Sequence, residues 1–302
     1  MKKNSSQEIK HFLSRSTFEE EVILARDSSW PRISIITPSY NQAEFLEETI
    51  LSILNQDYPN LEYIIVDGGS TDSSIEIIEK YRKYLAYWVS EPDCGQADAL
   101  SRGFAHCTGE IMAWQNADDA YLPGALRTVG EFFKQNPNVE FAFGNLAFID
   151  EHSQQIGELR FAPTEYLGIL FEGMVMHNQA AFFTPSAFNK AGGIKLEYRY
   201  AFDYDFFLCL SCVAQPHFLH KTLGLYRVHS GSLTHSSRNV TCKGEVAAIK
   251  AKYLSSLGIG KMSSPLLQLI RFAFLLRRAA WYARLGDWDY LLQGVRRRIF
   301  RS

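Results

Sequence analysis

The chain has 302 residues, 46% hydrophobic and 21% charged, which is an ordinary globular composition with enough apolar material for a large core. Its formal net charge of −2 lacks the basic bias of a nucleic-acid-binding protein, and five cysteines are too few for a disulfide framework. The charge is uneven, because residues 265–302 hold eight Arg and two Asp, which indicates a basic tail with its own partner.

The first 30 residues form a polar extension in which residues 18–24 are predicted to make a short helix. No apolar stretch typical of a secretory signal follows Met1. The chain also has no uninterrupted run of about 18 apolar residues, the length needed for a membrane-spanning helix. These features predict a cytoplasmic protein.

Strand and helix patterns alternate after the extension. Strands are predicted over residues 32–37, 62–66, 85–89, 111–114 and 139–143, and helices over 43–54, 73–84, 97–106 and 122–134. This alternation predicts an α/β fold with a mostly parallel sheet flanked by helices. After about residue 145 the alternation decays, with helices expected over 166–171 and 203–213 and strands over 180–184 and 218–228.

We therefore predict one α/β domain over residues 31–235, followed by a helical, basic, amphipathic tail over 236–302. Ligands of parallel sheets bind beyond the carboxyl ends of the strands. Three of the four segments that follow strands contain carboxylates, and these should converge on one cleft.

Motifs in a fixed order make the chain resemble glycosyltransferase family 2. They are residues 37–41, 47–56, 67–72, 91–103, 116–119, 177–179, 202–205 and 226–229. The resemblance implies a GT-A type fold, an inverting mechanism and a nucleotide-diphosphate-sugar donor. A UDP-sugar is the family's commonest donor, with guanosine and thymidine donors left open.

The resemblance also makes residues 31–235 a catalytic domain, with residues 31–120 as its nucleotide-binding half and residues 121–235 as its acceptor half. It assigns individual residues to the two substrates. It places the donor against Thr37, Pro38, Tyr40, Asn41, Asp67, Gly68, Asp93, Gln96, Asn116 and Asp118. It places the acceptor, a glycan or a lipid-linked molecule, near Glu91, His177 and Gln179.

Asp67 has a chemical role that does not depend on the resemblance. It ends a predicted strand, and the two glycines after it allow backbone to approach a ligand closely. Its carboxylate is suited to accept hydrogen bonds from a nucleobase or ribose. The structural alternative is a turn in which Ser70 or Asp72 caps the next helix.

Residues 116–119 are the expected site of a divalent cation, Mn²⁺ or Mg²⁺, which would stabilise the diphosphate leaving group. Adjacent carboxylates at Asp118 and Asp119 repel each other unless a cation or a helix N-terminus compensates. His229 matches a late histidine that reaches the metal in many related enzymes, and a structural role is its alternative. The family usually has Asp where this chain has Asn116.

Asp203 matches the family's general base, which takes the proton of the acceptor hydroxyl. Carboxylates serve in this way when burial raises their pKa, and the aromatic residues around Asp203 would supply that apolar shell. Phe202 stands where the family commonly has Glu. This departure and Asn116 leave a second hypothesis, an inactive relative that binds nucleotide-sugar and scaffolds polysaccharide assembly.

The tail contains one helical segment with two distinct sides. Arg271, Arg277, Arg278 and Arg284 share one sector with Phe274 and Trp281, whereas Leu269, Phe272, Ala273, Leu276 and Ala280 lie opposite. This pattern predicts peripheral contact of residues 265–302 with the inner face of a cell membrane. The alternative is packing on the catalytic domain or, as a homodimer, on a second subunit.

Overall fold

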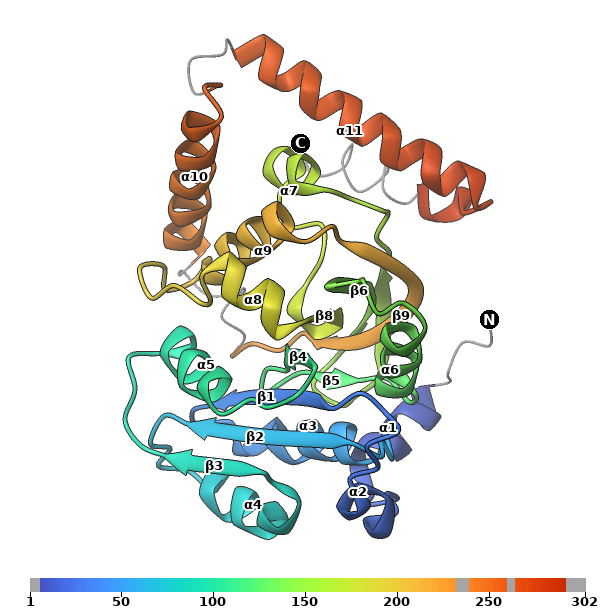
Figure 1. Cartoon of the computed structure of the whole chain (residues 1–302), viewed down its shortest axis with the longest axis vertical. Coiled ribbons are helices and arrows are strands. Elements are labelled where there is room, and N and C mark those ends of the chain that lie inside the picture. Colours follow the sequence, from blue (N-terminus) through green and yellow to red (C-terminus); the bar gives the residue numbers. More distant parts are fainter. Residues whose placement is uncertain (1–5, 232–238, 260–263, 292–302) are drawn as a thin grey trace.

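The computed structural model describes residues 6–231, 239–259 and 264–291. The first half of the domain alternates strands and helices as predicted (Figure 1). Its elements are β1 (Ile33–Ser39), α3 (Ala43–Leu54), β2 (Leu61–Asp67), α4 (Ser74–Tyr81), a 3-10 turn (Arg82–Tyr84), β3 (Tyr87–Ser90), α5 (Gln96–Ala105) and β4 (Ile111–Trp114). β1 pairs in parallel with β2 and β4, and β2 with β3.

β1 and β2 form the buried centre of this half. Every residue of both strands is buried, as expected for parallel strands covered on two faces. α5 packs against both strands, and Gly103 makes this approach possible because a Cβ there would lie 2.5 Å from Ile36. The parallel arrangement brings the carboxyl ends of β1, β2 and β4 to one edge of the sheet.

The second half extends the same sheet but is mixed in direction. Its elements are β5 (Ala120–Tyr121), α6 (Ala125–Gln135), β6 (Phe141–Ile149), β7 (Gln155–Leu159), α7 (Tyr166–Glu172), a 3-10 turn (Asn178–Ala180), β8 (Ala181–Phe183), α8 (Pro185–Ala191), α9 (Phe202–Val213) and β9 (His217–Arg227). The strand order is β3-β2-β1-β4-β8-β6-β9-β5, with β7 beside β6. Four pairs in this half are antiparallel: β4 with β8, β6 with β8, β6 with β7, and β5 with β9. One pair, β6 with β9, is parallel.

The sequence patterns missed several parts of this half. The connection from β6 to β7 is too short for a parallel crossover, so the two strands form a hairpin. β6 continues to Ile149, well beyond its predicted end at residue 143. The prediction stopped early because Gly144 and Asn145 interrupt the apolar pattern, although they do not end the strand. A Cβ at Gly144 would lie 2.6 Å from the Lys221 carbonyl oxygen on β9, which explains the glycine.

The N-terminal extension packs on the domain through two helices, α1 (Ser6–Ser14) and α2 (Glu20–Ala25). α2 corresponds to the predicted short helix, and α1 was not predicted. Ile9 and Leu13 of α1 are buried in a cluster with β5, β6 and β9. The Asn55 side chain at the end of α3 donates to the Phe12 carbonyl oxygen. α1 therefore covers this edge of the sheet.

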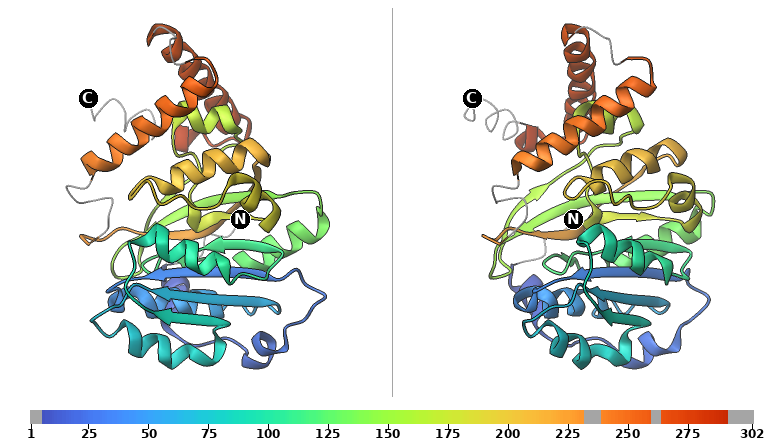
Figure 2. Two further views of the ribbon diagram at one scale, coloured as in Figure 1. Left: turned by 60° about the vertical axis from the view of Figure 1, so that its left-hand side comes forward. Right: turned by 90° about the vertical axis from the view of Figure 1, so that its left-hand side faces the viewer.

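The tail forms two helices, α10 (Asn239–Ser256) and α11 (Ser264–Arg284). α11 packs on α7 and lies at the end of the molecule opposite β3 (Figures 1 and 2). Within the described ranges, no helix is both long enough and apolar enough to span a membrane.

Candidate active site

The loops after β1 and β2 are tied to each other. The Asn41 amide N–H donates to Ser70 Oγ at 2.8 Å, and the Asn41 side-chain oxygen accepts from the Thr71 N–H at 2.8 Å. Asn41 has a φ of 52°, a left-handed conformation that asparagine tolerates better than most residues. The adjacent Tyr40 is 58% exposed and presents its ring to solvent beside this junction.

Two of the expected donor residues lie inside β1 and not after it. Thr37 and Pro38 are buried, and the Thr37 hydroxyl is 3.0 Å from the Tyr63 hydroxyl on β2. The Thr37 side chain is therefore used within the sheet. Any contact that Thr37 makes with a ligand would have to come from its backbone.

Asp67 organises its own loop. Its carboxylate is fully buried and accepts hydrogen bonds from the Ser70 N–H at 2.8 Å, the Ser70 hydroxyl at 2.5 Å and the Ser90 hydroxyl of β3 at 2.7 Å. Asp67 thus closes this turn with its own carboxylate. Asp72, which the structural alternative names as a cap, accepts the Ser74 N–H at the start of α4 at 3.0 Å. Ligand binding by this carboxylate stays a prediction.

Asp93 lies directly against the Asp67 loop. A Cβ added to Gly68 would be 2.8 Å from Asp93 Oδ2, so only glycine allows this approach. Asp93 Oδ1 accepts the Gly95 N–H at 2.7 Å, and burial raises the pKa of Asp93. The pair of loops therefore carries a half-buried carboxylate at the sheet edge, whereas Glu91 beside it is exposed.

A chain of side-chain amides supports the loop after β4. Gln96 at the start of α5 donates to Asn116 Oδ1 at 2.7 Å, and the Asn116 amide donates to Asp119 Oδ2 at 3.0 Å. Asn116 thus accepts on one side and donates on the other. An ionised aspartate at position 116 has no hydrogen to donate and would repel Asp119, which gives the departure from the family pattern a structural reason.

Asp119 faces the protein interior. It is 2% exposed, Oδ2 also accepts from the Gln179 amide at 2.6 Å, and Oδ1 accepts from the Arg227 N–H at 2.9 Å. Burial and the neighbouring Asp118 charge raise the pKa of Asp119. With both oxygens engaged, its geometry favours positioning of the loop over metal ligation, and Gln179 belongs to this buried network and not to an open acceptor surface.

Asp118 points the other way, towards His229. Its Oδ2 is 3.2 Å from His229 Nε2, and the side chains are 24% and 8% exposed. The His229 ring also packs on Phe45 of α3, with the ring centroids 4.6 Å apart. β9 and α3 together therefore fix the imidazole beside the carboxylate.

The Asp118–His229 pair satisfies one geometric test for a divalent cation. Two neighbouring ligands of an octahedral ion, each about 2.0–2.1 Å from it, are about 3 Å apart, close to the observed separation. In the part of the chain that the structure describes, no group of three or more His, Cys, Asp or Glu side chains could hold a metal. The pair thus suits an ion such as Mg²⁺ or Mn²⁺ that draws its remaining ligands from substrate phosphates and water.

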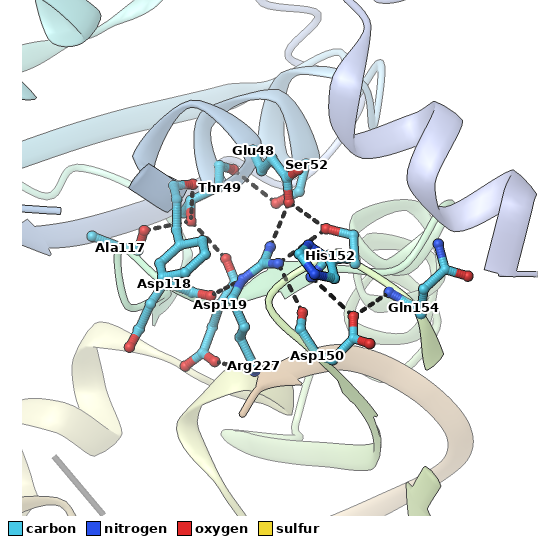
Figure 3. A network of polar contacts seen from close by, with 12 residues as sticks. Glu48, Thr49, Ser52, Ala117, Asp118, Asp119, Asp150, His152, Gln154 and Arg227 are labelled. Atoms are coloured by element: carbon cyan, nitrogen blue, oxygen red, sulfur yellow. Dashed lines mark hydrogen bonds and ion pairs between the residues drawn. The ribbon is translucent and has the colours of Figure 1, made fainter. Parts of the chain in front are cut away.

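Arg227 lies in the 226–229 motif, but sequence reasoning gave it no role of its own. It is 1% exposed and lies among α3, the loop after β4 and the turn after β6 (Figure 3). Its guanidinium donates to Glu48 Oε2 at 2.5 Å, the Asp118 carbonyl oxygen at 2.9 Å and the Asp150 carbonyl oxygen at 3.1 Å. A charged residue inside the apolar β9 pattern was the available signal, because a buried charge requires a partner.

The neighbouring residue of α3 supports the same loop. The Thr49 hydroxyl lies 2.9 Å from the Ala117 carbonyl oxygen and 2.7 Å from that of Asp119 (Figure 3). Glu48 and Thr49 both belong to the 47–56 motif, but the sequence analysis gave neither residue a role of its own. α3 therefore supports the loop that carries Asp118 directly through Thr49 and, by way of Arg227, through Glu48.

Asp203 lies in the first turn of α9. Burial raises its pKa to about 6, and its Oδ1 accepts the Tyr204 N–H at 2.7 Å. Phe202 and Tyr204 are buried beside it, as the predicted apolar shell requires. Phe202 is part of the hydrophobic core, which accounts for an apolar residue at that position.

His177, expected on the acceptor side, stacks on Phe161 with the ring centroids 5.8 Å apart. Burial lowers its pKa to about 4, so the imidazole is neutral near pH 7. The next residue, Asn178, has its amide 3.4 Å from Asn116 Oδ1. The 177–179 segment is therefore continuous with the network behind Asp118.

This architecture is that of a GT-A type glycosyltransferase. The model of Glycosyl transferase family 2 matches residues 34–190, and the chain belongs to that family. It is 30% identical to an uncharacterized glycosyltransferase of Mycobacterium tuberculosis over 195 residues, covering 63% of this chain and 72% of the relative. An uncharacterized glycosyltransferase of Haemophilus influenzae is 37% identical over 129 residues, covering 42% of this chain and 51% of the relative.

Solved structures share the fold. Residues 1–349 of S. aureus TarS in complex with UDP-GlcNAc superpose with a TM-score of 0.63 at 18% identity, covering 81% of this chain and 71% of that TarS fragment. The mannosyltransferase PcManGT of Pyrobaculum calidifontis, in complex with GDP-Man and Mn²⁺, gives 0.57 at 19% identity, covering 95% and 86%. The predicted family and GT-A fold are confirmed, and the chain is a glycosyltransferase.

Proposed function

We propose that the protein transfers a sugar from a nucleotide-diphosphate donor, a UDP-sugar in the first instance, to a hydroxyl of a glycan or lipid-linked acceptor, with inversion at the anomeric carbon. The observation that supports this best is the Asp118–His229 pair, which extends outward from a loop that is otherwise fixed by buried hydrogen bonds. Structural relatives bound to UDP-GlcNAc and to GDP-Man support the donor class.

The nucleoside end of the donor would lie over the joined loops after β1 and β2. Tyr40 offers an exposed ring there, and Asp93 offers a half-buried carboxylate. Asp67 and Asn41 would act mainly by keeping these loops in place, because their oxygens already accept hydrogen bonds from the protein. Gln96 and Asn116 would extend the same surface towards the diphosphate.

The diphosphate end would lie at Asp118 and His229, which would hold Mn²⁺ or Mg²⁺. When bound, the cation supplies charge that stabilises the departing nucleoside diphosphate. A Mn²⁺ complex of PcManGT supports this choice of ion. The chain's own contribution is to hold the Asp118 backbone through Thr49 and Arg227, so that its carboxylate does not need to reorganise.

Asp203 would be the general base. The acceptor oxygen forms a bond to the anomeric carbon as the bond from that carbon to the diphosphate oxygen breaks, and the hydroxyl proton passes to the Asp203 carboxylate. One displacement from the face opposite the leaving group inverts the anomeric centre. A pKa of about 6 leaves this carboxylate ionised at pH 7 while keeping it basic enough to accept the proton.

The acceptor would approach from the side of Glu91 and His177. Polysaccharide assembly at the cell envelope is the setting we propose, at the inner face of the cell membrane. The uneven charge of the chain, with eight arginines among residues 265–302, supports a location beside an anionic surface.

The test is a panel of UDP-, GDP- and dTDP-sugars examined by thermal shift and by release of nucleoside diphosphate, each with and without Mn²⁺. A ligand that binds the native state raises the melting temperature. We expect a donor-specific shift that requires Mn²⁺ and is lost in Asp118→Asn but kept in Asp289→Asn, an exposed carboxylate on the tail. If the donor raises the melting temperature equally, and turnover is equal, in Mn²⁺ and in chelator, the metal-dependent mechanism is refuted.

A further inference from the structure

α11 is amphipathic, and the structure shows which of its sides faces the protein. Phe274 stacks on Phe171 of α7, with the ring centroids 6.0 Å apart. Arg278 pairs with Glu172 at 3.0 Å. Arg277, at the margin of this side, pairs with Glu165 at 2.6 Å. The side that carries arginines therefore packs on the catalytic domain, as in the packing alternative, and is not the side available to a membrane.

The opposite side of α11 is apolar and faces outward. Leu266 is 43% exposed, Leu269 63%, Phe272 55% and Leu276 53%, and we call these four residues the apolar ridge. Their spacing of three or four residues places them along one side of the helix. α11 lies at the outer end of the molecule in all three views (Figures 1 and 2), and the exposed fractions show that the described chain leaves the apolar ridge open to solvent.

We propose that the apolar ridge is a docking surface for an anionic lipid bilayer, with α11 lying in the plane of the interface. A helix that binds in this way needs an apolar side to enter the acyl boundary and cationic residues near the headgroups. Arg271 and Arg284 are exposed on the same helix, and Arg277 is half-exposed at the edge of the ridge. The exposed Trp288 follows the helix and is the residue type that favours this interface.

The distribution of charge also favours a bilayer. The last 38 residues have a local charge of +6, whereas the whole chain has −2, so the excess of positive charge is concentrated in this part of the sequence. Four of the arginines, at positions 296, 297, 298 and 301, follow α11 in the sequence. Each basic residue near such a surface adds attraction.

A second copy of the chain is the less suitable occupant. Two-fold pairing through the ridge would bring the arginine-rich helices of both copies together, and like charges in contact oppose association. Four half-exposed side chains also offer less than the roughly 800 Å² that a stable interface buries on each partner. An interfacial helix has no such requirement, because the lipid adapts to its surface.

The test is co-sedimentation of the full chain with vesicles of equal parts phosphatidylglycerol and phosphatidylcholine, and with phosphatidylcholine alone. The ridge variant carries Leu269→Ser, Phe272→Ser and Leu276→Ser. The matched control carries Ile156→Ser, Leu196→Ser and Val240→Ser, which are 57%, 59% and 78% exposed but lie outside α11. We expect salt-sensitive binding of the wild type to anionic vesicles, a loss of about tenfold or more in partitioning for the ridge variant, and wild-type binding for the control.

Three results would overturn the proposal: no binding of the wild type to anionic vesicles, equal binding of the ridge variant, or equal loss in the control. A wild-type dimer that becomes a monomer in the ridge variant, with vesicle binding unchanged, would instead identify the ridge as an interface between copies. If the triple variant melts early, Leu269→Glu makes the same comparison with one exposed side chain. Binding needs no turnover, so a failure here is distinct from a failure of the proposed catalysis.

Discussion

Replacing Arg227 by methionine tests whether the buried guanidinium holds the catalytic loop. The side chain is fully buried, pairs with Glu48 and also donates to backbone carbonyls of the loops after β4 and β6. Breaking one partner out of a buried ion pair costs about 3–5 kcal/mol of unfolding free energy. At about 2–4 °C per kcal/mol for a large domain, Arg227→Met should lower Tm by roughly 6–20 °C.

The control and the partner variant make this expectation specific. Arg82→Met removes an arginine that is 69% exposed and pairs with Glu79 at 3.8 Å, so it should change the unfolding free energy by only about 0.5 kcal/mol. Glu48→Gln combined with Arg227→Met should be less damaging than the sum of the two single changes, by about 0.5–3 kcal/mol.

The assay is urea or thermal unfolding of the four proteins that make the cycle, with donor turnover measured alongside. Because Arg227 Nε holds the Asp118 carbonyl oxygen, turnover should fall even at temperatures where Arg227→Met is folded. A loss of stability below about 1 kcal/mol, or full additivity with Glu48→Gln, would contradict the assignment of Arg227 as the anchor of the loop.

The remaining predictions concern the carboxylates. Asp203→Asn should lower turnover by about 10²–10⁴-fold while keeping the donor-induced thermal shift, and wild-type turnover should rise with pH through about 6 as the base ionises. Because burial raises the Asp203 pKa, the unfolding free energy of the wild type should also fall as pH rises through about 6. Asp203→Asn should lack this fall, and identical stability–pH profiles of the two proteins would contradict the raised pKa. Asp118→Asn should abolish transfer and weaken nucleoside-diphosphate binding in Mn²⁺ by at least ~1–2 kcal/mol, measured by calorimetry. Asp119→Ala should instead lower the ligand-free unfolding free energy by about 1–3 kcal/mol through unpaired buried amides, whereas equal stability of the Asp118 and Asp119 variants would contradict their different roles.

Sequence patterns predicted the first half of the fold closely because its strands are buried on both faces and its helices have one apolar side. The predicted helix over 43–54 and strand over 62–66 agree with α3 and β2 to within a residue at each end. Parallel pairing then forces the segments after β1, β2 and β4 to one edge, which is why Asn41, Asp67 and Asp118 were expected together.

The directions of individual side chains were not accessible in the same way. Asp118 and Asp119 are adjacent, and the turn after β4 determines that one faces His229 and the other Gln179. The pair of Glu48 and Arg227 joins residues 179 positions apart, so no local pattern reveals it. The two sides of α11 were visible in the sequence, but its orientation depends on Glu165 and Glu172, which lie on another part of the chain.

The tail is connected to the catalytic machinery through α10. Glu245 on this helix accepts hydrogen bonds from the backbone N–H groups of Arg199, Tyr200 and Ala201, at 3.1, 2.8 and 2.8 Å. These residues lead directly into the first turn of α9, where Asp203 is held, and the Glu245 charge contributes to the raised pKa of Asp203. A deletion that removes α10 would therefore disturb the proposed base as well as any membrane contact. Substitutions on the exposed ridge of α11 separate the two effects, because they leave both Glu245 and the α7 contact in place.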